Sequence, residues 1–145
     1  MSKIVPTLPS GIAGPLGLLH LPRLWQKSSL AAAGKLADGY KDIGPGYDLM
    51  VLEAINIDPD AAREYIKSAK PAYVQFEKWI ATQPGVKLDA KTISDINATV
   101  AGYHHSAEIR TTILAAAGIE DEGKILDAVT LNFLDDLTEF HQALA

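Results

Sequence analysis

Prolines and glycines divide this chain into short segments, and no other feature constrains its fold as strongly. The 145 residues include eight prolines and eleven glycines, and most of these stand between stretches whose apolar residues recur every three or four positions. That spacing is typical of amphipathic helices, which proline and glycine begin or end. The sequence lacks the period-two alternation, Asn-Gly turns and β-branched runs that would indicate a sheet. We therefore predict an all-α fold of six to eight short helices packed at angles.

Capping residues indicate where the predicted helices begin. Asp48, Asp58, Asp89 and Ser106 each precede an apolar segment and can accept a hydrogen bond from a free N–H of the first turn. Pro22 suits the first turn of an earlier helix, because a proline there loses no hydrogen bond. We expect helices within residues 22–36, 49–55, 59–70, 71–83, 89–102, 106–118 and 126–144.

Length and composition indicate one domain. A chain of 145 residues with 48% hydrophobic content can bury one core but is short for two, so residues 1–145 are treated as a single helical domain. Its first part differs from the rest, because Pro6, Pro9, Gly11 and Gly14 interrupt apolar residues too often for a helix. We predict that residues 1–14 form an extended arm lying on the core.

Several classes of function are disfavoured by what the sequence lacks. The absence of cysteine excludes disulfides, thiolate metal sites and a cysteine nucleophile. No apolar run approaches the roughly 20 residues of a membrane helix, and the first residues do not resemble a signal peptide, so we expect no membrane partner and a cytoplasmic location. Motifs for binding nucleotides and the common hydrolase motifs are missing, and we expect no cofactor.

The distribution of charge argues against nucleic acid as a partner. The net charge is −5, and residues 119–145 hold seven acids against one base, Lys124. An acidic end repels phosphate backbones, and the remaining bases form no stripe interleaved with aromatic residues. We therefore expect a small-molecule ligand instead.

The first candidate site lies at the start of the predicted helix 22–36. Arg23 and Lys27 are one helical turn apart and project from the same side, so together they can hold a carboxylate or phosphate. The free amide groups of the helix N-terminus would add positive partial charge. The alternative is that both are solvated cations beside Trp25, which would then fill the core.

The second candidate site is Tyr103-His104-His105 with Glu108. Glu108 is four residues from His104 and three from His105, so either imidazole can pair with it if this stretch is helical. Such a pair would raise the pKa of the histidine and prepare it for general acid or base catalysis. The alternative is a polar break between two helices with exposed histidines.

The third candidate is a group of ionisable residues on the last predicted helix, namely Asp135, Asp136, Glu139 and His141. A carboxylate-bridged di-metal bundle needs two Glu-x-x-His motifs, and the sequence contains none. We interpret the group as a solvated acidic face and predict no metal. A single metal held by His104, His105, His141 and an acid remains an alternative, because ligands distant in sequence can converge.

The segment Leu21-Pro22-Arg23-x-x-x-Lys27 resembles a bacterial family known as domain of unknown function 5069. The resemblance continues through Tyr40, Asp48, Trp79 and Ile96-Asn97 and covers about residues 8–118. Members of the family often carry an arginine two residues after the motif lysine, where this chain has Ser29. The resemblance implies no activity, but it marks Arg23, Lys27, Asp48 and Asn97 as positions of interest.

These observations favour a small cofactor-independent enzyme that acts by acid–base chemistry on an organic metabolite, which could be anionic, as a lyase, isomerase or cyclase. Arg23 and Lys27 would bind the substrate with Trp25 and Asp48 nearby. His104 or His105, tuned by Glu108, would transfer the proton, and Tyr40 or Tyr103 would orient the substrate. Two alternatives stay open: a metal-dependent enzyme, and a non-catalytic ligand-binding or protein-interaction module that could form a homodimer through the arm or the last helix.

Overall fold

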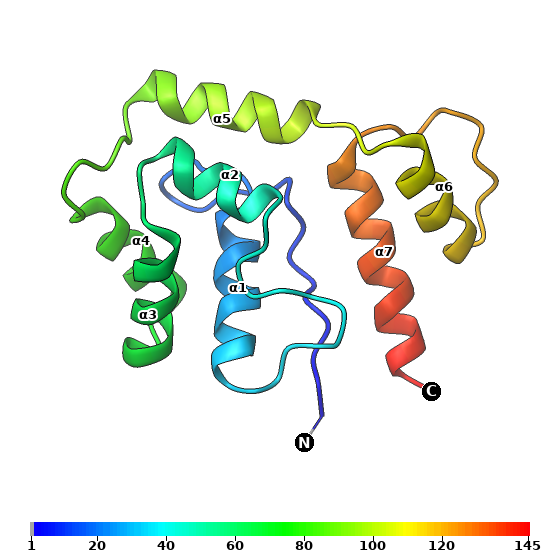
Figure 1. Cartoon of the computed structure of the whole chain (residues 1–145), viewed down its shortest axis with the longest axis horizontal. Helices are drawn as coiled ribbons and strands as arrows, with labels where there is room; N and C mark the ends of the chain where they lie inside the picture. Colours follow the sequence, from blue (N-terminus) through cyan, green and yellow to red (C-terminus); the bar gives the residue numbers. More distant parts are fainter. Residues whose placement is uncertain (1) are drawn as a thin grey trace.

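The computed structural model describes residues 2–145 and confirms the all-α prediction (Figure 1). These residues form seven helices and no strand beyond three isolated bridges. The helices are α1 (Leu21–Ala32), α2 (Tyr47–Ala54), α3 (Pro59–Ala69), α4 (Tyr73–Ala81), α5 (Ala90–Gly102), α6 (Ala107–Ala116) and α7 (Ala128–Ala143). Within the described residues, none of the helices has both the length and the apolar character needed to cross a membrane.

The hydrophobic core belongs to α1–α5. In Figure 1, α1 stands in the middle, α3 and α4 lie to one side, and α5 runs across the top. Their apolar faces meet in one cluster that includes Leu24, Leu52, Ile66, Phe76 and Val100, all of them buried. At about 1.5–3 kcal/mol per buried side chain of this size, the cluster is the main source of stability.

Two of the four predicted N-caps are confirmed. The Asp89 carboxylate accepts from the backbone N–H of Thr92 at 3.1 Å, and the Ser106 hydroxyl accepts from that of Ile109 at 3.3 Å. Asp58 occupies the N-cap position of α3, but its side chain makes no capping bond. The prediction for Asp48 is wrong, because Gly46 is the N-cap of α2 and Asp48 lies buried in the first turn.

The first helix is shorter than the predicted 22–36. It ends at Ala32, and Gly34 adopts a left-handed φ of 70°. The N–H of Lys35 then donates to the carbonyl of Leu30, and the N–H of Gly34 donates to that of Ala31. This pair of bonds is a Schellman motif, which satisfies the last carbonyls and turns the chain away from the helix.

The segment before α1 is non-helical and passes between α1 and α7 (Figure 1). Ile4 forms a parallel bridge with Leu36. Asn97 on α5 holds the end of the segment, accepting from Leu19 N–H at 2.9 Å and donating to the carbonyl of Gly17 at 2.6 Å. The extended arm over residues 1–14 stays a prediction, and Met1 lies outside the described residues.

Helices α6 and α7 form a hairpin beside this core, and α7 does not lie as its apolar pattern predicts. Phe133, Leu137, Phe140 and Leu144 recur at helical spacing, which usually marks a buried face. All four are at least 38% exposed, whereas Asp136, which flanks them on the same helix, is 3% exposed. The orientation has a physical cause, since Asp136 forms an ion pair with the buried Arg23 of α1. The predicted solvated acidic face is therefore wrong for Asp136.

Candidate functional site

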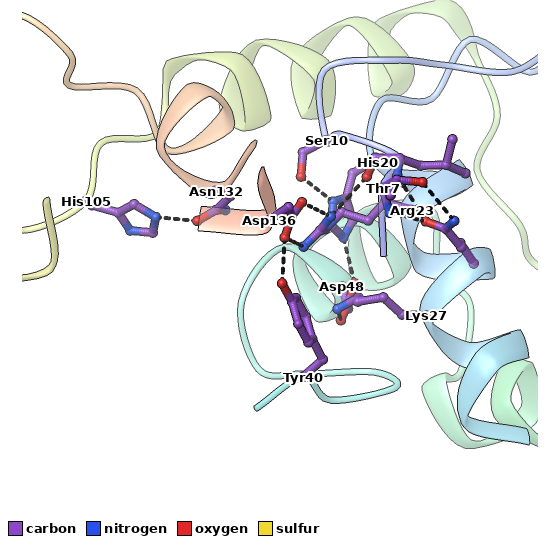
Figure 2. A network of polar contacts seen from close by, with 12 residues as sticks. Thr7, Ser10, His20, Arg23, Lys27, Tyr40, Asp48, His105, Asn132 and Asp136 are labelled. Atoms are coloured by element: carbon purple, nitrogen blue, oxygen red, sulfur yellow. Dashed lines mark hydrogen bonds and ion pairs between the residues drawn. The ribbon is translucent and has the colours of Figure 1, made fainter. Parts of the chain in front are cut away.

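Asp48 is the centre of a buried polar network between α1 and α2 (Figure 2). One carboxylate oxygen lies 2.6 Å from His20 Nε2. The other accepts from the ammonium group of Lys27 and from the backbone N–H of Gly44, the latter at 2.8 Å. Asp48 and His20 are each 2% exposed and Lys27 is 9% exposed, so these polar groups interact in a nearly dry environment where their mutual attraction is strong.

His20 connects this network to the N-terminal segment. Ser10 Oγ lies 2.8 Å from His20 Nδ1. Because the ionised Asp48 can only accept, Nε2 of His20 must carry a hydrogen, and Nδ1 of the neutral ring accepts from the Ser10 hydroxyl. The backbone of His20 has a left-handed φ of 73°, a conformation in which a residue other than glycine is strained.

Burial controls the protonation of His20, and the neighbouring groups control that of Asp48. Burial lowers the pKa of His20 below its ordinary value of 6.5, and the hydrogen bond with Asp48 offsets only part of this effect. Burial alone would raise the pKa of Asp48, but the bond from His20 and the charge of Lys27 outweigh it and hold that pKa below its ordinary range. The network is therefore built from a neutral imidazole, a carboxylate and an ammonium ion.

This arrangement predicts a loss of stability in mild acid. Because the folded-state pKa of His20 lies below 6.5, the unfolded chain binds the additional proton first as the pH falls. The contribution of His20 is complete above pH 6.5 and declines below it, by at most about 1.4 kcal/mol per pH unit. Free energies of unfolding measured over a pH series from neutral to mildly acidic check this slope.

His20→Asn is the variant of choice for that series, because asparagine tolerates positive φ better than most residues and does not titrate. The variant is expected to be less stable but to show a flatter dependence on pH. The exposed His141 provides a matched control, and His141→Asn should keep the wild-type slope. Equal slopes in wild type and His20→Asn would contradict the assignment of a neutral His20.

Arg23 belongs to a second buried group that joins α1 to α7. Its guanidinium makes two bonds to the Asp136 carboxylate, the Nη2–Oδ1 bond being 3.0 Å, and also donates to the carbonyl of Leu8 at 3.0 Å. The hydroxyl of Tyr40 donates to the same carboxylate at 3.0 Å. Burial and the charge of Asp136 raise the pKa of Tyr40, so its phenol stays protonated and remains a donor.

The interpretation of Arg23 and Lys27 as solvated cations is wrong, since both are buried. Neither is free for an anion, because Asp136 already neutralises Arg23 and Asp48 neutralises Lys27. Trp25 is partly buried and packs against the hydrophobic core, and its indole N–H donates to the carbonyl of Pro71 at 3.0 Å. Arg23 and Lys27, which were predicted to bind substrate, thus hold helices together instead.

The main pocket lies between α2 and the α6–α7 hairpin and has a volume of about 560 Å³. Leu49 and Met50 of α2 and Ile109 of α6 give it apolar walls. Its polar groups come from Tyr47, Glu53, Tyr103, His105 and Asn132. Among the residues lining the pocket there is no lysine or arginine, so the site favours a neutral or cationic ligand over an anionic one.

Two of the predicted site residues, Tyr103 and His105, line this pocket together. The ring of Tyr103 lies edge-on to His105 at 6.1 Å and to Tyr47 at 5.7 Å between ring centroids. Tyr47 in turn packs against His20, with 5.3 Å between centroids, so an aromatic wall separates the pocket from the buried network. Burial raises the pKa of Tyr47 to about 12, and its hydroxyl donates to the carbonyl of Val100 at 2.7 Å.

His105 is held by α7. Its Nε2 lies 2.8 Å from Oδ1 of Asn132 (Figure 2). A carbonyl oxygen can only accept, so Nε2 carries the hydrogen and Nδ1 of the neutral ring is left with a lone pair. The imidazole is therefore positioned, half-buried and able to accept a proton, which are the requirements for a general base.

His104 and Glu108 are exposed, and neither lines the pocket. Residues 104 and 105 precede α6, so the helical spacing on which a histidine pair with Glu108 depended is absent. The backbone of His104 forms an antiparallel bridge with Asp127 instead, which anchors the start of α7. Within residues 2–145, no group of three or more histidine, aspartate or glutamate side chains is arranged to hold a metal ion.

Sequence reasoning missed the residues whose partners are distant. His20, Ser10 and Asn132 carry no motif of their own. Asn132 is 27 residues from His105, and Ser10 is 10 residues from His20 across a segment without helical periodicity. One local signal could have indicated Asn132: it stands one helical turn before Asp136, so both side chains lie on the inward side of α7.

Comparison with known proteins adds no identity: the chain matches no family model, no curated protein and no solved structure.

Proposed function

We propose that this protein is a small cofactor-independent enzyme that transfers a proton on an organic molecule bound in the pocket between α2 and the α6–α7 hairpin. The observation that carries the proposal is the His105 imidazole, which lines the pocket and is oriented by Asn132. Histidine is the side chain that enzymes use most often as a general acid or base, and the role requires a fixed orientation. The reaction class is that of a lyase, isomerase or cyclase.

The lining of the pocket supports a particular class of substrate. Tyr47 and Tyr103 present aromatic rings, and Glu53 is the one acidic residue of the lining. Aromatic faces and a carboxylate together favour a positively charged amine, while the apolar walls favour a hydrocarbon part. We infer a substrate that is neutral or carries an amine, in place of the anionic metabolite expected from Arg23 and Lys27.

The resemblance to domain of unknown function 5069 belongs to this proposal. The motif residues Arg23 and Lys27, together with Tyr40, Asp48 and Asn97, all take part in buried or partly buried polar contacts. In this interpretation the motif residues join the helices, and the proton transfer takes place in the adjacent pocket.

Incubation with a mixture of metabolites in deuterated water tests the proposal even though the substrate is unidentified. A lyase or isomerase that transfers protons at carbon consumes a compound or introduces deuterium into it, and mass spectrometry detects both. The wild-type protein is expected to convert at least one compound. His105→Gln, which keeps a donor toward Asn132 but cannot transfer the proton, should lower the rate by roughly 10²–10⁴-fold.

The neighbouring histidine provides the matched control. His104 is exposed and does not line the pocket, so His104→Gln should retain the wild-type rate. Equal conversion by His105→Gln and wild type would overturn the role of His105. Binding of compounds in the pocket without consumption or labelling of any of them would instead favour the non-catalytic ligand-binding module.

A further inference from the structure

The outward face of α7 carries a continuous apolar stripe that the pocket and the buried networks do not use. It consists of Phe133, Leu137, Phe140 and Leu144, which we call the α7 seam. Their exposed fractions are 38%, 48%, 46% and 69%. Single exposed apolar residues are ordinary on a protein surface, but four large ones in line on one helix mark an interaction surface.

The spacing of the α7 seam indicates that its partner is another helix. The intervals from Phe133 to Leu144 are four, three and four residues. This is the a/d pattern of a heptad repeat, in which each side chain fits between residues of a facing helix. A shallow hollow of about 290 Å³ adjoins the stripe between α6 and α7, bounded by Ile119, Leu134 and Leu137. The same surface therefore offers both projecting side chains and a space that can receive one.

The distribution of charge on α7 favours a second copy of the chain as that helix. The net charge of −5 opposes contact between copies over most of the surface. On α7, however, Asp135 and Glu139 lie about 100° or more around the helix from each residue of the α7 seam. Asp136 flanks the seam, but it is buried and neutralised by Arg23. Two α7 seams can thus meet without bringing carboxylates together.

We propose that two copies of this chain associate through their α7 seams, with the two helices antiparallel. An isologous contact of this kind uses the same patch on both copies, and antiparallel helices place opposite dipole ends side by side. A helix of 16 residues is only about 24 Å long, so the contact is smaller than the roughly 800 Å² per partner of a standard interface. The dimer is accordingly weak and forms at micromolar concentration or above.

Sedimentation equilibrium over about 1–500 µM protein tests the association, because this range spans micromolar dissociation constants. The wild-type chain should pass from monomer to dimer. Leu137→Glu should stay monomeric at all concentrations with an unchanged unfolding midpoint, because residue 137 is exposed in the monomer. Val74→Glu is the matched control, since Val74 is 50% exposed but lies on α4, and it should dimerise like wild type.

The absence of cysteine allows the orientation to be tested directly. Phe133→Cys and Leu144→Cys, carrying tags of different size, are mixed and oxidised. An antiparallel pair brings position 133 of one copy beside position 144 of the other, so the mixed disulfide should dominate. Monomeric wild type throughout the range, or a dimer unaffected by Leu137→Glu, would overturn the proposal. Disulfides formed only between identical variants would overturn the antiparallel arrangement.

Discussion

Asp136→Asn is expected to destabilise the protein by about 3–5 kcal/mol, the usual cost of leaving a buried cation without its partner. Arg23 is 7% exposed and makes two bonds to this carboxylate. The asparagine keeps the size of the side chain but removes the charge, so the loss reports the uncompensated guanidinium. Denaturant unfolding followed by far-UV circular dichroism measures it, and the loss should appear as a lower transition midpoint.

Asp135, the residue before Asp136 in the sequence, provides the control. Burial, together with the charges of Glu139 and Asp136, raises the pKa of Asp135, so its ionised form gains little from the fold. Asp135→Asn should therefore change stability by no more than about 0.5 kcal/mol. The double variant Arg23→Met, Asp136→Leu should recover most of the loss, because well-packed apolar residues can replace a buried ion pair. Wild-type stability of Asp136→Asn would show that the ion pair does not hold α7.

Asp48→Asn is expected to cost a similar amount, about 3–5 kcal/mol, for a different set of contacts. The carboxylate accepts hydrogen bonds from His20, Lys27 and the backbone N–H of Gly44. An asparagine amide can still accept from His20, but it then turns its NH₂ group toward two donors. Thermal unfolding at neutral pH should show the loss as a lower midpoint.

Removing the Lys27 cation as well as the Asp48 carboxylate distinguishes the effect of charge on stability from the effect of packing. Lys27→Met in the Asp48→Asn background should restore part of the stability, because the uncompensated ammonium is the main penalty. Asp95→Asn is the exposed control: it removes a pair with Lys91 that lies in solvent and should leave the midpoint unchanged. If Lys27→Met makes Asp48→Asn less stable still, packing and not charge is the larger effect.

Local signals in the sequence predicted the helices well. The capping residues Asp89 and Ser106 and the early Pro22 act within one turn of chain, so their effect is independent of the rest of the fold. The end of α1 was misplaced by four residues because two glycines, at 34 and 39, offered equivalent stops. Only the observed Schellman bonds distinguish between them.

The candidate site was harder to predict because it depends on contacts between distant residues. Arg23 and Asp136 are 113 residues apart, and nothing near either one indicates that they meet. Their ion pair also changes the usual interpretation of α7, since it draws Asp136 inward beside the buried Ala128 and Leu131 and leaves the apolar stripe outside. The sequence grouped Tyr103 with His105, and both line the pocket. It offered Glu108 as a partner for either His104 or His105, whereas the partner of His105 is Asn132 on α7.

The orientation of α7 underlies both the candidate site and the proposed dimer, because it places Asn132 at the pocket, Asp136 at Arg23 and the α7 seam in solvent. The rate at which a thiol reagent modifies a single introduced cysteine tests it directly, in protein dilute enough to be monomeric. Leu137 is 48% exposed and Leu131 is fully buried. Leu137→Cys should therefore react readily in the folded protein, whereas Leu131→Cys should react only on unfolding. Rapid reaction at position 131 with protection at position 137 would contradict the orientation and everything inferred from it.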